Sequence, residues 1–187
     1  GMADVIKAFS VGKVYMPRVV HTTQTYENLL LAIKDKGLKV TEAKAGVVMD
    51  VGKRVTATFL GPVGTGYKEL NDYSAVLKLT FGSTEFLFMG DAEQLSEKQI
   101  MAADHNVSAD VLKVGHHGSD TSSGVAFLTA VRPRYAVISV GRGNRYGHPS
   151  STTLEKLKSP CITVLRTDVH GTIVITSDGT TIEVTTE

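Results

Sequence analysis

Two adjacent histidines follow directly on a short apolar run, and this feature constrains the fold most. Residues 111–114 read Val-Leu-Lys-Val, and Gly115, His116, His117 and Gly118 come next. Such a run is typical of a buried strand that is followed by a turn containing glycine. Two imidazoles in succession at the end of a buried strand need polar partners or a ligand. The pattern therefore predicts a functional site at a strand end.

A second apolar run ends in a carboxylate, and a third histidine lies in a polar loop. Asp91 follows residues 86–89, which predict another strand, and His148 follows a loop rich in Gly and Arg. Carboxylate and imidazole groups are the ligand types that suit Zn, Mn or Fe. A bridging aspartate can hold two such ions for hydrolysis. The alternatives are that Asp91 caps the next helix and that His148 is an exposed loop residue.

Several polar side chains are candidates for handling a substrate. His148 could protonate a leaving oxygen or contact a phosphate, and Arg142 or Arg145 could pair with an anion. Asn71 and Ser74 either line the same cleft or shape a turn, and the turn is favoured.

Three serines after the histidine pair have two interpretations. Ser119, Ser122 and Ser123 either bind an oxyanion or cap the helix that follows, and capping is favoured. His21, His105 and His170 belong to no motif and are predicted to be structural or surface residues.

Size and composition narrow the function classes. A chain of 187 residues suits a single domain. Lys and Arg total 20 against 19 for Asp and Glu, so any contact with a polyanion must be local. No apolar run approaches the ~18 residues of a membrane-spanning helix. The lone Cys161 excludes an internal disulfide and a Cys-x-x-Cys zinc motif, and we expect it to be a small core residue.

Hydrophobic periodicity predicts hairpins in the first half and alternating strands and helices in the second. We expect helices at 3–9, 22–36, 92–103, 125–131 and 151–157. We expect strands at 13–16, 38–42, 46–51, 54–60, 73–81, 85–89, 111–114, 135–140, 162–165, 172–176 and 181–184. This order indicates an α/β (α+β) fold of mixed sheets with helices packed outside.

Five segments in order resemble the metallo-β-lactamase superfamily, specifically the hydrolase domain of the bacterial competence DNA-uptake channel protein and its free-standing relatives. They are Asn71-Asp72-Tyr73-Ser74, Phe88-Met89-Gly90-Asp91-Ala92-Glu93, Asp110-Val111-Leu112-Lys113-Val114-Gly115-His116-His117-Gly118-Ser119, Ser139-Val140-Gly141 and Tyr146-Gly147-His148-Pro149-Ser150. The resemblance implies a four-layer αββα sandwich of two mixed sheets. It also implies that Asp91 bridges two divalent ions, Zn or Mn, and that His116 ligates one of them.

The chain lacks the principal metal motif of that family, His-x-His-x-Asp-His followed by Gly-Gly, which would lie just upstream of residues 1–9. Each first-row ion needs at least three or four ligands, and Asp91 with His116 and Asn71 cannot supply two sets. We therefore expect this chain to bind metal poorly or not at all. We expect it to be a single domain, 1–187, that lacks its N-terminal strands and covers the exposed sheet edges by forming a homodimer.

The resemblance favours a metal-dependent hydrolase of phosphate esters, a phosphodiesterase or nuclease-like enzyme that acts on nucleic acid. His148 or His117 would protonate the leaving oxygen, and Asn71, Ser74, Ser119 and Arg145 would contact the substrate. A non-catalytic scaffold domain and a thioester or lactone hydrolase are the alternatives. We expect an extracytoplasmic setting for the full-length protein.

Overall fold

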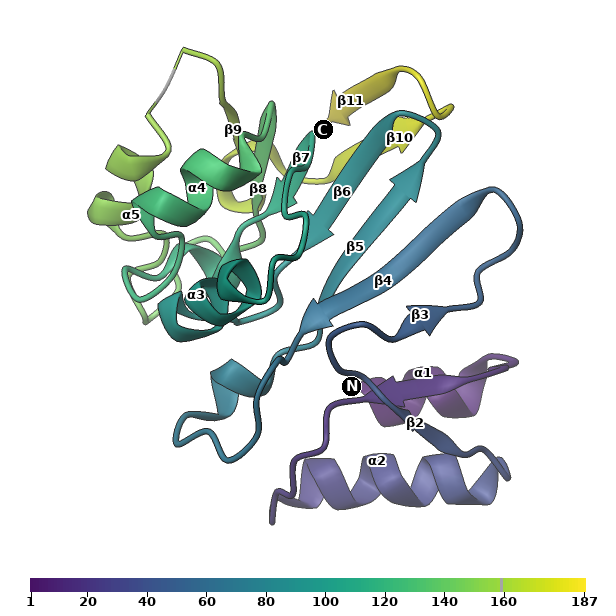
Figure 1. Cartoon of the computed structure of the whole chain (residues 1–187). Coiled ribbons are helices and arrows are strands. Elements are labelled where there is room, and N and C mark those ends of the chain that lie inside the picture. The colour runs from purple at the N-terminus through teal and green to yellow at the C-terminus, as the bar shows by residue number, and fades with distance from the viewer. Residues whose placement is uncertain (159) are drawn as a thin grey trace. The chain divides into compact units, whose positions relative to one another are not determined.

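The computed structural model describes residues 1–158 and 160–187, which form two compact units (Figure 1). The units are Gly1–Ala43 and Lys44–Glu187. Both contain helices and strands, and the larger unit contains parallel and antiparallel strand pairs. The mixed α/β class predicted from the sequence is therefore confirmed. Among the described residues, no helix has both the length and the apolar character needed to cross a membrane.

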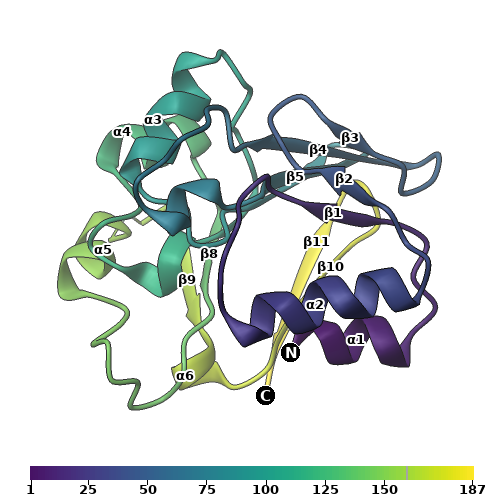
Figure 2. The ribbon, with the colours of Figure 1, turned by 90° about the horizontal axis from the view of Figure 1, so that it is seen from below.

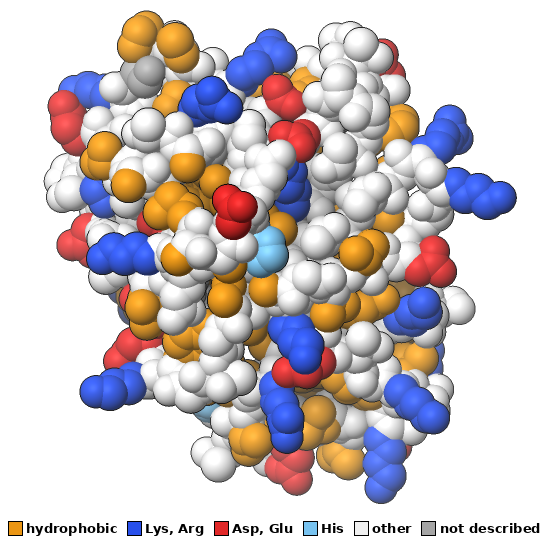
Figure 3. Space-filling model, viewed as in Figure 1, with side chains coloured by type: hydrophobic (Ala, Val, Ile, Leu, Met, Phe, Trp, Pro, Cys, Tyr) orange, Lys and Arg blue, Asp and Glu red, His pale blue; other side chains and the backbone are white. Residues whose placement is uncertain are grey.

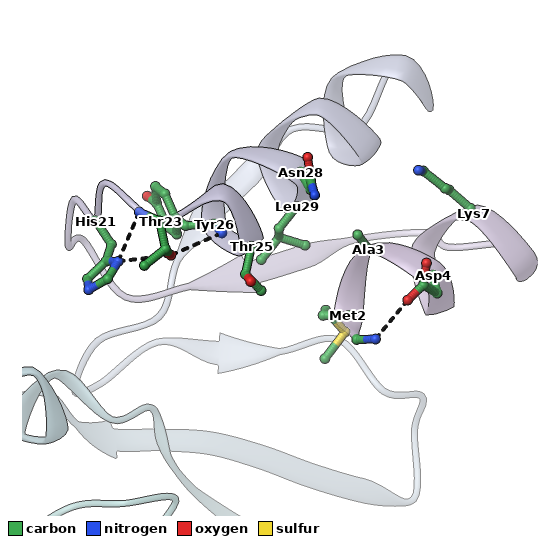
Figure 4. A pocket seen from close by; sticks show the side chains of 11 residues that line it. Met2, Ala3, Asp4, Lys7, His21, Thr23, Thr25, Tyr26, Asn28 and Leu29 are labelled. Carbon is green, nitrogen blue, oxygen red and sulfur yellow. Dashed lines mark hydrogen bonds and ion pairs between the residues drawn. The ribbon is translucent and has the colours of Figure 1, made fainter.

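The first unit packs two helices with one pair of parallel strands. Its elements are α1 (Met2–Ala8), β1 (Val14–Met16), α2 (Gln24–Asp35) and β2 (Val40–Glu42). Ile6, Ala32 and Ile33 form its buried core. The α2 helix begins after Thr23, whose hydroxyl accepts a hydrogen bond from the Tyr26 N–H, as Figure 4 shows. The helix expected at 22–36 is therefore capped by Thr23.

The second unit contains a sheet of seven strands in the order β3-β4-β5-β6-β7-β8-β9. Their bounds are β3 Val48–Met49, β4 Val55–Gly61, β5 Val76–Phe81, β6 Thr84–Phe88, β7 Val111–Lys113, β8 Tyr135–Ile138 and β9 Thr163–Arg166. The pairs from β3 to β6 are antiparallel, and those from β6 to β9 are parallel. The sheet thus changes from a hairpin half to a crossover half at β6, as the sequence predicts.

Helices cover one face of this sheet, and a hairpin lies over the other (Figure 2). The helices are α3 (Gln94–Ala102), α4 (Val125–Val131) and α5 (Ser151–Lys156), and the hairpin is β10 (Ile173–Ser177) with β11 (Ile182–Thr186). Leu87 and Leu112 pack in the helix-side core, whereas Phe86, Val111 and Ile173 line a cavity of about 400 Å³ on the hairpin side. Because side chains alternate along a strand, one strand serves both layers. The layers helix, sheet and hairpin are consistent with the expected sandwich.

Some local predictions differ from the structure. The β5 strand begins at Val76, not at residue 73, because Leu70–Tyr73 form the 3-10 helix η1. The sequence also gave no indication of the short helix α6 (Thr167–His170). Cys161 is exposed, so the prediction that it is a core residue is wrong. It lies in the turn that precedes β9, not on the inward face of that strand.

Candidate functional site

Three parallel strands end level with one another and deliver the predicted site residues to one edge of the sheet. The register pairs Phe88 of β6 with Lys113 of β7, and Lys113 with Val137 of β8. Just beyond the strand ends, the His116 N–H donates to the Gly90 carbonyl oxygen over 3.0 Å. The loops that carry Asp91 and His116 are therefore hydrogen-bonded to each other, at the sheet edge where open α/β folds place their ligands.

The side chains in these loops form two histidine–carboxylate pairs. Asp91 Oδ1 lies 3.4 Å from His117 Nε2, and Glu93 Oε1 lies 3.1 Å from His116 Nδ1. The His148 ring lies 5.5 Å from the His116 ring, centroid to centroid. We refer to these five residues as the histidine–carboxylate cluster. Asp91 thus contacts the second histidine of the pair, and His116 contacts Glu93.

An unusual backbone turn presents both rings of the histidine pair to the site. The 3-10 helix η2 (Gly115–Gly118) holds His116 at φ 45° and His117 at φ 54°, the left-handed region that non-glycine residues seldom adopt. Gly115 precedes this turn where a Cβ atom would lie 2.7 Å from the Ala92 carbonyl oxygen. Strained backbone of this kind clusters at functional sites and persists where the surrounding structure fixes it.

The orientation of the His117 ring follows from its two partners. Its Nδ1 lies 2.7 Å from the Ser139 carbonyl oxygen. A carbonyl oxygen can only accept, so Nδ1 carries the proton and donates it. In the neutral ring Nε2 then directs a lone pair at the Asp91 carboxylate. A proton or a cation between His117 Nε2 and Asp91 Oδ1 would interact favourably with both atoms.

His148 is held by the loop that contains it. Its ring stacks on Tyr146 with 5.9 Å between the centroids, and its backbone N–H and carbonyl are both bonded to the Asn144 side chain. Loss of hydration lowers the pKa of His148, the charges of His116 and His117 lower it further, and Asp120 and Asp91 oppose the shift.

Asn71 and Ser74 contact the cluster as well as forming a turn. Asn71 Nδ2 donates to Glu93 Oε1 over 3.1 Å, and Ser74 Oγ accepts from the Asp91 N–H at the same distance. Ser74 is also the residue at which η1 ends. The segment is therefore a turn, and its side chains contact the Glu93 carboxylate and the Asp91 backbone. Its role in lining the cleft stays a prediction.

The helix caps considered for α3 and α4 are not formed. The α3 helix begins after Glu93, so Asp91 is not its N-cap. The α4 helix begins after Gly124, and neither Ser122 nor Ser123 caps it. Instead, the buried Ser122 hydroxyl donates to the carbonyl oxygens of the histidine turn and of Ser119, which braces that turn.

Ser119 and Arg145 differ in accessibility. Ser119 is buried, and its hydroxyl bonds to the side chains of Asp120 and Thr121. Arg145 is exposed, and its Nη2 donates to the Tyr146 hydroxyl over 2.9 Å. Arg142 donates from Nε to the backbone carbonyl of Asp168. Arg142 and Arg145, the two arginines predicted to pair with an anion, are therefore both open to solvent.

Sequence reasoning missed two charged residues beside the site. Glu93 was not singled out, although it stands two positions after Asp91 in a segment already marked as functional. Lys113 was counted only as part of a strand, yet a lysine inside an apolar run is itself a signal. Its Nζ donates to the Val114 carbonyl, and burial lowers the pKa of its ammonium while Asp91 opposes that shift.

The donor atoms of the cluster are too few for a metal centre on their own. Within residues 1–158 and 160–187, no three or more His, Cys, Asp or Glu side chains are grouped to hold an ion. The cluster offers pairs, whereas an ion such as Zn needs at least three protein ligands. The residues present thus do not fit the two-metal site that the family resemblance implies.

The first unit also has a pocket, of about 470 Å³, where α1 meets the start of α2 (Figure 4). Asp4 in its wall pairs with the Gly1 amine, and His21 bonds to Thr23. These contacts belong to the two helix starts. The candidate site is therefore the cluster in the second unit.

The second unit is thus a mixed α/β domain with a polar cluster at the ends of its parallel strands. No protein-family model matches the chain. The chain is 36% identical to ComE operon protein 3 of Bacillus subtilis over 174 residues, which cover 92% of this chain and 22% of that protein. It is 37% identical to Competence protein ComA of Neisseria gonorrhoeae over 116 residues, 62% of this chain and 17% of the relative.

Recombination protein 2 of Haemophilus influenzae is 40% identical over 103 residues, 55% of this chain and 13% of that protein. The chain thus spans about a fifth of the length of ComE operon protein 3, and less of the other two. It is related to a segment of competence proteins. The competence part of the family resemblance is therefore confirmed, and the metallo-β-lactamase part stays a prediction.

Proposed function

We propose that this chain is a segment of a competence protein that works in DNA uptake, and that its histidine–carboxylate cluster hydrolyses phosphate esters. The observation that carries the proposal is the convergence of Asp91, Glu93, His116, His117 and His148 at the ends of parallel strands. Because the chain is homologous to competence proteins, we propose the DNA backbone as the substrate of the cluster. In the full-length protein we place this reaction on the extracytoplasmic side, where DNA enters.

The chain's own residues supply binding and proton transfer. Arg145 is open to solvent beside the cluster, and a guanidinium pairs readily with a phosphate. His117, fixed through Nδ1, or His148, fixed through its backbone, would protonate the leaving oxygen. Asn71 and Ser74 would keep the two carboxylates in place, and Ser119 would support the turn from inside.

We further propose that the complete protein uses two divalent ions, Zn or Mn, with Asp91 and His116 among their ligands. The described donors of this chain do not form a full ligand set for either ion. A homodimer that covers exposed sheet edges remains part of the proposal.

The first test measures hydrolysis of bis(p-nitrophenyl) phosphate with and without added Mn or Zn. Asp91→Asn and His117→Ala should each lower the rate by about 100-fold or more, because they remove a proposed proton donor and its carboxylate partner. The matched controls Asp104→Asn and His105→Ala change the same residue types outside the cluster and should leave the rate unchanged. Equal rates for all four variants would contradict the proposal.

A non-catalytic scaffold domain is the second candidate, and the incomplete ligand set among the described residues favours it. Absence of both hydrolysis and stoichiometric metal binding by calorimetry would support it. A thioester or lactone hydrolase would use the same cluster, so hydrolysis of those esters in preference to the phosphodiester would replace the phosphate assignment.

A further inference from the structure

A small pocket opens directly beside the histidine–carboxylate cluster. It has a volume of about 190 Å³ and is lined by His117, Val140, Gly141, Asn144, Tyr146 and His148. Pockets for drug-sized ligands usually measure ~300–1,000 Å³, so this one suits a single ring system. Three of its walls are flat rings, and Val140 contributes an apolar side chain.

Tyr146 stands out among these walls because its ring is exposed. The residue is 66% exposed, although a tyrosine ring is mostly apolar. The Arg145 guanidinium lies 5.0 Å from the ring centroid and donates to the hydroxyl, so the ring and the cation form one unit. The guanidinium has five N–H donors and uses one of them in that bond, so others can reach a phosphate.

The loop that carries Tyr146 is organised before any ligand arrives. Asn144 Nδ2 donates to the carbonyl oxygens of Gly141 and His148, and its Oδ1 accepts from the N–H groups of Tyr146 and His148. These four bonds use the full capacity of the amide. Asn144 therefore fixes the loop and has no donor left to read the edge of a ligand.

The loop beside the pocket carries positive charge of its own. The segment from Gly141 to Ser150 contains Arg142 and Arg145 and no Asp or Glu. Over the face drawn in Figure 3, side chains of Lys and Arg and of Asp and Glu are both widely scattered, in keeping with a net charge of +1. Asp91 and Asp120 lie near enough to His148 to act on its charge. The attraction for a phosphate is therefore confined to the part of the loop that carries Arg145.

We propose that this pocket binds one unpaired nucleobase of single-stranded DNA, with Tyr146 as the stacking ring and Arg145 on the adjoining phosphate. The inference rests on the proposed phosphodiester function and specifies its substrate as single-stranded. Bases in a duplex are stacked on each other, so only an unpaired base can stack on Tyr146. Because Asn144 is saturated, binding depends on stacking and tolerates any base sequence.

The test compares three labelled 12-nucleotide ligands by fluorescence anisotropy: single-stranded DNA, an abasic strand with the same phosphates, and the duplex. The wild-type chain should bind the base-containing single strand between about 5-fold and 100-fold more tightly than the other two, the range for one stacked base. Tyr146→Ala should remove this preference. Tyr146→Phe keeps the ring and should retain it.

The control is Phe9→Ala, which removes a ring of similar exposure, 64% against 66%, in the first unit. It should bind as the wild type does. Equal wild-type affinity for the base-containing and abasic strands, no change in Tyr146→Ala, or no binding of any strand would each overturn the inference. Bis(p-nitrophenyl) phosphate contains no nucleobase, so its hydrolysis reports separately on the proposed function.

Discussion

The Asn144 side chain is hydrogen-bonded to both backbone polar groups of His148: Nδ2 donates to the His148 carbonyl oxygen over 2.6 Å, and Oδ1 accepts from its N–H over 3.1 Å. One amide thus fixes the backbone from which the third histidine of the cluster projects. The same amide binds Gly141 and Tyr146, so the loop closes on itself around a single residue.

Replacing Asn144 should therefore loosen this loop. Asn144→Ala removes four hydrogen bonds, and we expect the free energy of unfolding to fall by about 1–3 kcal/mol, because each partly exposed bond contributes ~0.5–1.5 kcal/mol and water replaces some of them. Chemical denaturation measures this loss, and amide hydrogen exchange of Tyr146 and His148 should accelerate.

The control is Asn106→Ala. Asn106 Oδ1 accepts a single bond from the Ser108 N–H, so its loss should cost less and leave exchange in the His148 loop unchanged. Equal losses of unfolding free energy in the two variants would show that the four bonds of Asn144 stabilise the fold no more than the single bond of Asn106 does.

Gly115 should not tolerate a side chain. A Cβ atom at this position would lie 2.7 Å from the Ala92 carbonyl oxygen, so Gly115→Ala must displace the histidine turn or the loop that carries Asp91. Overpacking of this kind costs typically ~1–3 kcal/mol. Thermal unfolding measures the loss of stability, and the imidazole NMR signals of His116 and His117 should shift.

Gly141→Ala is the matched control for this prediction. No atom would lie within 4 Å of its added Cβ, and its φ is not in the positive range. Gly141→Ala should leave both stability and the imidazole signals unchanged. A Gly115→Ala variant as stable as Gly141→Ala would show that the turn can adapt.

Much of the fold was predictable because hydrophobic periodicity reports local structure. The α4 helix has the expected bounds, and β7 and α2 differ from expectation by one or two residues at an end. The exposure of Cys161 was not predictable, because the sequence does not reveal which face of a turn a residue occupies. The position of β10 over β7 was not predictable either, because it depends on contacts between residues that are far apart in the sequence.

The site was predictable in its location but not in its pairing. Parallel strands bring their carboxyl ends to one edge, so the convergence of Asp91 with the histidine pair followed from the order of elements. Which histidine meets which acid depends on the left-handed turn at His116 and His117, and no sequence pattern encodes that geometry. The contact between Glu93 and His116 depends on the same left-handed turn, so the sequence did not predict it.

Glu97 should make stability depend on pH in an unusual direction. Its buried carboxylate accepts hydrogen bonds from the N–H groups of Ser123 and Gly124 before α4. Loss of hydration nevertheless raises the pKa of Glu97 above the ordinary glutamate value of 4.5, against the effect of those bonds. The folded chain thus binds this proton more tightly than the unfolded chain does, and the stability this adds is lost as pH rises above 4.5 through the raised pKa.

Glu97→Gln should remove this contribution, so the difference in unfolding free energy between wild type and variant should change across that pH interval. Urea denaturation at several pH values between 4.5 and 7 measures the difference. Glu97→Ala should be less stable than Glu97→Gln by about 1–3 kcal/mol at each pH, because it leaves two N–H groups without an acceptor. A pH-independent difference for Glu97→Gln would contradict the raised pKa.

Asp168 should act in the opposite sense. Arg166 donates to it from Nε over 3.0 Å and from Nη2 over 2.6 Å, a two-bond pair that lowers the pKa of the Asp168 carboxyl below 3.8. The stability from this pair is present above pH 3.8 and is lost as the pH falls through the lowered pKa. Asp168→Asn should therefore cost about 0.5–1 kcal/mol at pH 7, as a partly exposed ion pair does, and nothing once the wild-type carboxyl is protonated. Denaturation of both proteins at pH 7 and in acid measures this, and an equal gap at both would mean that the pair's charge adds no stability.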